Sequence, residues 1–154
     1  MIDVYTSNNG SPTSSPCACT TVKKLSRVLG RVYDSALAPA GINVTQFAVM
    51  RCISRHNGEP LARVADELVM DRTSLYRAIT PMVRDGWIKL AAGADGRSRS
   101  ALVTRKGSQV LAKAGGRWDQ VQDRLIGAFG KKEWGALAAE LQRLGECAAS
   151  AAAD

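Results

Sequence analysis

The residues best suited to chemistry in this sequence are polar side chains near the start of one short predicted helix. Arg72 and Arg77 flank Thr73 and Ser74, and together they form a polar face at the N-terminal end of that helix. A helix fits the major groove of B-DNA, where its first turns reach the base edges. An arginine there can donate two hydrogen bonds to guanine or one to a phosphate. The expected DNA-binding residues of this helix are Arg72, Thr73, Ser74 and Arg77.

A second pair of arginines lies in a polar turn. Residues 91–100, AAGADGRSRS, connect two short β-like runs and contain Arg97 and Arg99. Two such runs joined by a glycine-containing turn predict a hairpin with a protruding tip. A thin extended wing of this kind can enter the minor groove, which favours Arg97 and Arg99 as DNA contacts.

A different chemistry is indicated at the start of the first predicted helix, where Cys19 lies. Free amides and the positive end of the helix dipole stabilise a thiolate there, and Lys23 adds a positive charge one turn later. Cys17 is either the partner that resolves a sulfenic acid at Cys19 or a tail residue without a role. Cys52 is expected in the core, and Cys147 is assigned no role.

Other chemistries are poorly represented. Cys17 and Cys19 have no second cysteine or histidine pair nearby, and His56 is the only histidine, so we expect no metal site. No glycine-rich phosphate loop, nucleophile elbow, HExxH motif or carboxylate pair stands out. Cys19 as a thiol peroxidase nucleophile is the only enzymatic candidate. We therefore expect no cofactor and no enzymatic activity.

The elements that must position these residues are mostly helices. Apolar residues recur at steps of three and four in six segments, and Thr45, Asp71 and Thr104 are predicted to cap three of them. Two short helices joined by a tight break and followed by a hairpin predict a winged helix-turn-helix, mainly α with a small β-hairpin wing. The segments run over residues 19–38, 46–55, 60–68, 71–86, 104–125 and 134–144.

Composition and charge agree with a DNA-binding domain. The chain has 154 residues and a net charge of +7, with a pI of about 9.6. Residues 20–106 hold 15 basic and seven acidic side chains, whereas residues 107–154 hold six of each. A basic balance suggests a polyanion partner. No apolar stretch is long enough to span a membrane and no secretory signal is visible, so we expect a cytoplasmic protein.

The stretch over residues 44–107 resembles the multiple antibiotic resistance regulator (MarR) family. Its most specific part matches the family's wing, an Asp-x-Arg tip that runs into a Leu-Thr-x-x-Gly turn, with Val103 in the usual leucine place. The resemblance covers residues 18–147. The matching residues are Asp95, Gly96, Arg97, Ser98, Arg99, Leu102, Val103, Thr104 and Gly107.

The resemblance implies a homodimeric transcription regulator, commonly a repressor, that binds a pseudo-palindromic operator in double-stranded DNA. It also implies that Asp95 orients Arg97 by an ion pair and that Arg97 enters the minor groove. Residues 1–16 are rich in Ser, Thr, Asn, Gly and Pro, which predicts a flexible N-terminal tail. For the rest of the chain the resemblance implies a dimerisation helix (17–43), a winged helix-turn-helix DNA-binding region (44–104) and C-terminal dimerisation helices (105–150).

The first helix resembles the organic hydroperoxide resistance regulator branch of the family. In that branch a peroxide-sensing cysteine is hydrogen-bonded by two tyrosines, four and fourteen residues later. Here Tyr33 stands in the second place and Lys23 replaces the first. The resemblance implies redox sensing by Cys19, with Tyr33, Lys23 and Cys17 around it.

A small ligand is the competing effector. Many relatives bind aromatic acids between the dimer helices and the DNA-binding lobe, and Tyr33, Phe47, Met50 and Arg51 could line such a pocket here. Three functions thus stay open: a regulator released by oxidation of Cys19 or by a ligand, a regulator that responds only to an aromatic ligand, and a non-specific architectural DNA-binding protein. The groove-facing polar residues of the fourth segment argue against the last.

Overall fold

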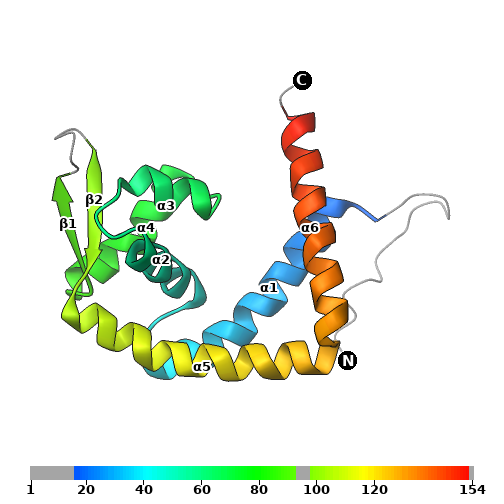
Figure 1. Ribbon diagram of the computed structural model, residues 1–154, viewed down its shortest axis with the longest axis horizontal. Coiled ribbons are helices and arrows are strands. Elements are labelled where there is room, and N and C mark those ends of the chain that lie inside the picture. The colour runs from blue at the N-terminus through cyan, green and yellow to red at the C-terminus, as the bar shows by residue number, and fades with distance from the viewer. Residues whose placement is uncertain (1–15, 93–97, 153–154) are drawn as a thin grey trace.

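The computed structural model describes residues 16–92 and 98–152 of the chain. In these ranges the chain forms six α-helices, one short 3-10 helix and a two-stranded antiparallel hairpin, which confirms the expected mainly α winged helix-turn-helix (Figure 1). The bounds are α1 Ala18–Leu37, η1 Ala38–Ala40, α2 Val44–Arg55, α3 Leu61–Glu67, α4 Arg72–Arg84, β1 Ile88–Ala92, β2 Arg99–Val103, α5 Arg105–Phe129 and α6 Lys131–Ala151.

The helices fall into two parts. Figure 1 shows α2, α3, α4 and the hairpin gathered at one end of the long α5, whereas α6 rises steeply from the other end. Helix α1 packs against α5 and also contacts α2. The part made of α2, α3, α4, β1 and β2 is called the DNA-binding lobe below, after the function that the sequence predicts for it.

Helix α2 lies at the centre of the core, as its apolar residues on several sides predict. Its start differs from the prediction that Thr45 caps a helix beginning at Gln46. Asn43 is the cap, because its side chain accepts from the Gln46 amide at 2.8 Å and the Gln46 side chain accepts from the Asn43 amide at 3.1 Å. This capping box starts the helix two residues earlier.

Helices α3 and α4 form the helix-turn-helix. The N-cap predicted at Asp71 is confirmed, since its Oδ1 accepts from the Ser74 amide at 2.9 Å. Helix α4 continues through Pro81 and buries Leu75, Ile79 and Met82. One face of α4 is therefore committed to the core and the other is left for solvent or a partner.

The hairpin is held against the helix-turn-helix. Strands β1 and β2 pair from Ile88 opposite Val103 to Ala92 opposite Arg99. An isolated bridge joins Pro60, just before α3, to the buried Ser100 of β2. The predicted contacts Asp95 and Arg97 lie outside the described residues.

Thr104 joins the wing to the rest of the lobe. Its amide donates to the Trp87 carbonyl at 2.9 Å, and its hydroxyl donates to the Gly86 carbonyl at 2.7 Å. The same hydroxyl oxygen accepts from the Gly107 amide at 3.0 Å, which confirms Thr104 as the cap of α5. Gly107 is buried so tightly that an added Cβ would lie 2.2 Å from the Trp87 carbonyl oxygen.

Helix α6 has little to pack against in a single chain. None of its residues is buried, and it makes its contacts with α5. Among the described helices, none has the length and apolar character needed to cross a membrane.

We expect Gly107→Ala to lower the free energy of unfolding by about 1–3 kcal/mol, because a methyl group there must displace the Trp87 backbone. Gly116→Ala, in the same helix, is the matched control, because nothing lies within 4 Å of its Cβ position. We expect the control to gain about 0.5–1 kcal/mol from helix propensity. Urea unfolding at equal protein concentration measures both, and equal effects would contradict the close packing at Gly107.

Candidate DNA-binding surface

The N-terminal turns of α4 carry the predicted polar residues on the side away from the core. Arg72, Thr73 and Arg77 are exposed. Ser74 is half-buried, and its hydroxyl donates to Asp71 Oδ2 at 2.6 Å. Ser74 thus supports the start of the helix, and its hydroxyl proton is already used. The three exposed side chains form the part of α4 that is available to a groove.

The cap of α4 is also an electrostatic feature. Hydrogen bonds from the Ser74 hydroxyl and amide lower the pKa of Asp71, so its carboxylate is charged at neutral pH. A negative charge at a helix N-terminus is stabilised by the helix dipole. The start of α4 therefore stays ordered while Arg72 and Arg77 project from it.

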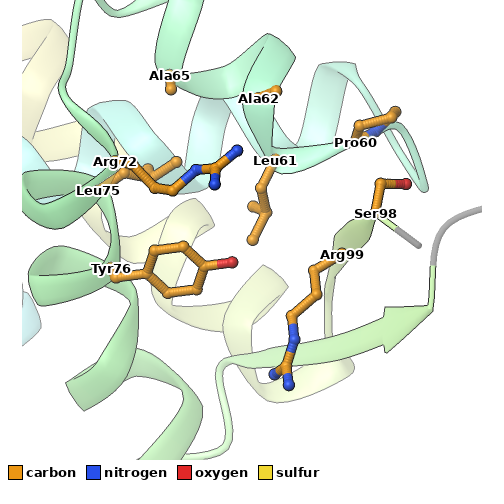
Figure 2. A pocket seen from close by; sticks show the side chains of 9 residues that line it. All are labelled: Pro60, Leu61, Ala62, Ala65, Arg72, Leu75, Tyr76, Ser98 and Arg99. Atoms are coloured by element: carbon orange, nitrogen blue, oxygen red, sulfur yellow. The ribbon is translucent and has the colours of Figure 1, made fainter.

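The wing borders the same surface as α4. A pocket of about 290 Å³ lies between α3, α4 and β2. Figure 2 shows Arg72 and Tyr76 of α4 and Arg99 of β2 at this pocket, with Leu61 of α3 behind them. Helix α4, the recognition helix of the helix-turn-helix, and the wing consequently present basic side chains on the same surface.

These arginines keep their hydrogen-bond donors available. Within residues 16–92 and 98–152, Arg72, Arg77 and Arg99 form no ion pair, whereas Arg55 and Arg84 are paired with carboxylates. An unpaired guanidinium can turn its full fork of donors to a phosphate or to guanine. The arginines of this surface are therefore suited to bind an anionic partner.

The turn between α3 and α4 contains an unusual residue. Val69 has a φ of 49° and its side chain is 93% exposed. A β-branched residue in the left-handed region is strained, and no burial compensates for it here. The sequence predicts a break at this point but not its backbone conformation.

The predicted redox residues lie at different places along α1. Cys17 is the N-cap residue, and Cys17 and Cys19 are exposed free thiols. The Thr20 side chain and amide, together with Lys23, lower the pKa of Cys17. Tyr33 lies about 21 Å further along the helix, too far to touch Cys19 of its own chain. Its hydroxyl donates to Gln122 of α5.

The predicted ligand pocket is assembled differently from the expected set. A pocket of about 360 Å³ between α2 and α5 is lined by Phe47 and Arg51, with Trp118 in place of Met50 and Tyr33. The Arg51 guanidinium carbon lies 5.0 Å from the centre of the Trp118 ring. Met50 is fully buried in the core.

Tyr76, which helical spacing places beside the polar face of α4, joins Arg72 and Arg99 at the first pocket. Sequence reasoning missed another contact, in which Glu67 of α3 meets His56, the residue that follows α2. Eleven residues separate that pair, so no short motif signals their contact.

Helix α4 has an exposed polar N-terminal face. It is preceded by a second helix and a tight turn and is followed by a docked hairpin, and this arrangement defines a winged-helix DNA-binding protein. The comparisons with solved structures agree. A crystal structure of the Mycobacterium tuberculosis transcriptional regulator MosR in complex with DNA is 34% identical in sequence, with a TM-score of 0.80. The alignment covers 88% of this chain and 98% of MosR.

Two more distant structures share the fold. PcaV of Streptomyces coelicolor, in complex with its natural ligand, is 16% identical, with a TM-score of 0.72 over 88% of this chain and 99% of that one. MarR is 18% identical, with a TM-score of 0.69 over 92% and 96%. No protein-family model matches the chain, and no curated protein sequence is similar to it.

The chain belongs to the MarR family of winged helix-turn-helix transcription regulators, which confirms the resemblance seen in the sequence. It is a DNA-binding regulator of transcription, and the relatives it matches are regulators.

We expect Val69→Asn to raise the free energy of unfolding by about 0.5–1 kcal/mol, because asparagine tolerates the left-handed backbone better than valine. This gain corresponds to a rise in Tm of about 1–4 °C for a chain of this size. Val22→Asn, at an exposed valine within α1, is the control and should gain nothing. An unchanged Tm for Val69→Asn would show that Val69 does not hold the left-handed conformation.

Proposed function

We propose that the chain acts as a homodimer on a pseudo-palindromic operator, with α4 of each subunit in a major groove and each wing in a flanking minor groove. The observation that carries this proposal is the exposed N-terminal face of α4, with Arg72, Thr73 and Arg77 unpaired and facing away from the core. Two-fold symmetry would place the two helices about 34 Å apart, one turn of DNA.

Unsatisfied apolar surface supports the dimer. Helix α6 buries none of its residues, and Leu144 is exposed. Phe129 at the end of α5 and Val22 and Val32 of α1 are exposed as well. Apolar side chains on α1, α5 and α6 would be covered by the same helices of a second copy. The apolar side chains of the DNA-binding lobe are already covered, because they share one core with the end of α1, η1 and part of α5.

The wing supplies the minor-groove contacts in this proposal. Arg99 is exposed at the start of β2. Arg97 and its partner Asp95 are assigned to the tip by their match to the family's wing. A dimer bound across a promoter blocks access to it, so we assign repression in the cytoplasm as the mode of action.

The thiols at the start of α1 are the proposed sensor, with Cys19 as the residue that is oxidised. The Cys19 thiolate attacks one oxygen of a hydroperoxide, and the O–O bond breaks. The attacked oxygen and its hydrogen stay on the sulfur as a sulfenic acid, and the other oxygen takes a proton from solvent and leaves as an alcohol. Lys23 stands four residues after Cys19, one turn further along α1. Tyr33 can reach this site only from the partner subunit. The lowered pKa of Cys17 makes Cys17 the second reactive thiol.

A small aromatic ligand is the second candidate effector. The pocket between α2 and α5 offers Phe47 and Trp118 as aromatic walls and Arg51 as a cation for a carboxylate. It lies where the DNA-binding lobe meets α5, so a ligand there could change the angle between them.

The DNA site is tested by selecting a preferred duplex from random DNA and comparing its affinity with that of an unrelated duplex. We expect Arg77→Ala to weaken binding to the selected duplex about 10- to 100-fold and to leave non-specific binding nearly unchanged, because it removes a base contact. Arg84→Ala, at the opposite end of α4 and paired with Asp85, is the matched control. Equal affinity of the wild type for both duplexes, with one salt dependence, would favour the architectural function.

The sensor is tested by titrating the complex with the selected duplex with cumene hydroperoxide and, separately, with salicylate. We expect peroxide to release the wild type and Cys147→Ser, an exposed cysteine in α6, but not Cys19→Ser. Release that survives Cys19→Ser and is lost in Cys17→Ser would move the sensor to Cys17. Release by salicylate alone would identify the ligand-responsive regulator.

A further inference from the structure

Three side chains of the kind that bind metal ions converge where α2 and α3 end. Cys52 lies on α2, His56 is the residue that follows this helix, one turn after Cys52, and Glu67 is the last residue of α3. Each residue offers one ligand atom, and these three atoms lie within 4.8 Å of one another. They are the Cys52 Sγ, a His56 ring nitrogen and a Glu67 carboxylate oxygen. Two residues at i and i+4 share a face of a helix, which is why the thiol and the imidazole point the same way.

Charged side chains surround these three. His56 Nε2 contacts Glu67 Oε2, whereas Arg55 contacts the other oxygen, Oε1. Glu59 Oε2 pairs with Arg63 Nε at 2.7 Å and lies 3.6 Å from His56 Nδ1, which is too long for a hydrogen bond. Metal-bound histidines usually donate their second N–H to a carboxylate, and metal-bound carboxylates are themselves hydrogen-bonded. Arg55 thus already holds the position of such a partner at Glu67, and Glu59 is a carboxylate near the second ring nitrogen of His56.

The cluster is buried on one side and open to solvent on the other. Cys52 is completely buried, while the side chains of His56 and Glu67 are 17% and 36% exposed. A cation can therefore enter from solvent past the imidazole and carboxylate and reach the thiol at the bottom. Because the three ligand atoms would lie on one side of the ion and solvent on the other, a fourth coordination position would be left for water.

We propose that Cys52, His56 and Glu67 bind a divalent transition metal of the zinc class, with water as the fourth ligand. A sulfur, a nitrogen and a carboxylate oxygen match the ligand preferences of Zn²⁺ and exclude Mg²⁺ and Ca²⁺, which take oxygen ligands. On binding, the Cys52 thiol loses its proton to solvent and a metal–sulfur bond forms. The thiolate and the carboxylate balance the two positive charges of the ion.

The experiment uses the full chain with Cys17, Cys19 and Cys147 each changed to serine, which leaves Cys52 as the only thiol. After treatment with a chelator and its removal, the protein is titrated with Co²⁺ and its absorption spectrum recorded. We expect one Co²⁺ per chain, with a thiolate-to-cobalt charge-transfer band in the near ultraviolet. No such band, or an unchanged band after Cys52→Ser, would overturn the proposal.

His56→Gln and Glu67→Gln keep the proposal testable if Cys52→Ser does not fold, because both side chains reach solvent. We expect each to weaken Co²⁺ binding at least 10-fold and to remove the rise in Tm that Zn²⁺ gives the parent. Asp66→Asn, a neighbouring exposed carboxylate of α3, is the matched control and should keep both effects. Equal binding by all three variants would contradict the site. None of these measurements involves DNA, so they are independent of the proposed operator binding.

Discussion

The hydrogen bonds of Thr104 determine how the recognition helix and the wing lie relative to each other. Through this residue the end of β2 is bonded to Gly86 and Trp87, where α4 gives way to β1, and to Gly107 at the start of α5. A helix and a hairpin can bind adjacent grooves of one duplex only if their spacing is constant. Thr104 provides that constancy through its amide and its hydroxyl, and it needs a glycine three residues later because the backbones approach so closely.

The same junction attaches the lobe to α5, one of the helices that we propose form the dimer. Because α5 begins at Arg105, a rotation of α5 carries the wing and α4 with it. Two further links connect α1 to the lobe and to α5. Asp34 of α1 accepts from the Val44 amide at the start of α2 at 2.7 Å, and Tyr33 donates to Gln122. A change at the start of α1 can therefore reach the DNA-binding lobe along helices that are already in contact.

Local patterns in the sequence predicted the elements, and contacts between distant segments explain what was missed. Helical spacing and the caps at Asp71 and Thr104 are local, and both caps are confirmed. Thr45 was the wrong cap because Asn43 is equally suited and also finds Gln46 at the third helical position. The pocket residue Trp118 comes from α5, so no inspection of α2 alone could place it.

The proposed metal site shows the same division between local and distant information. Cys52 and His56 are four residues apart, but the sequence predicts Cys52 only as a core residue, and Glu67 reaches them because α3 folds back against α2. A cation held there would join the ends of these two helices just before the turn at Val69 and the start of α4. It would thus stiffen the lobe itself, whereas oxidation at the start of α1 would act on the helices that we propose form the dimer. Metal binding and oxidation would therefore act differently. The metal would change the order within each lobe, and oxidation would change the distance between two lobes.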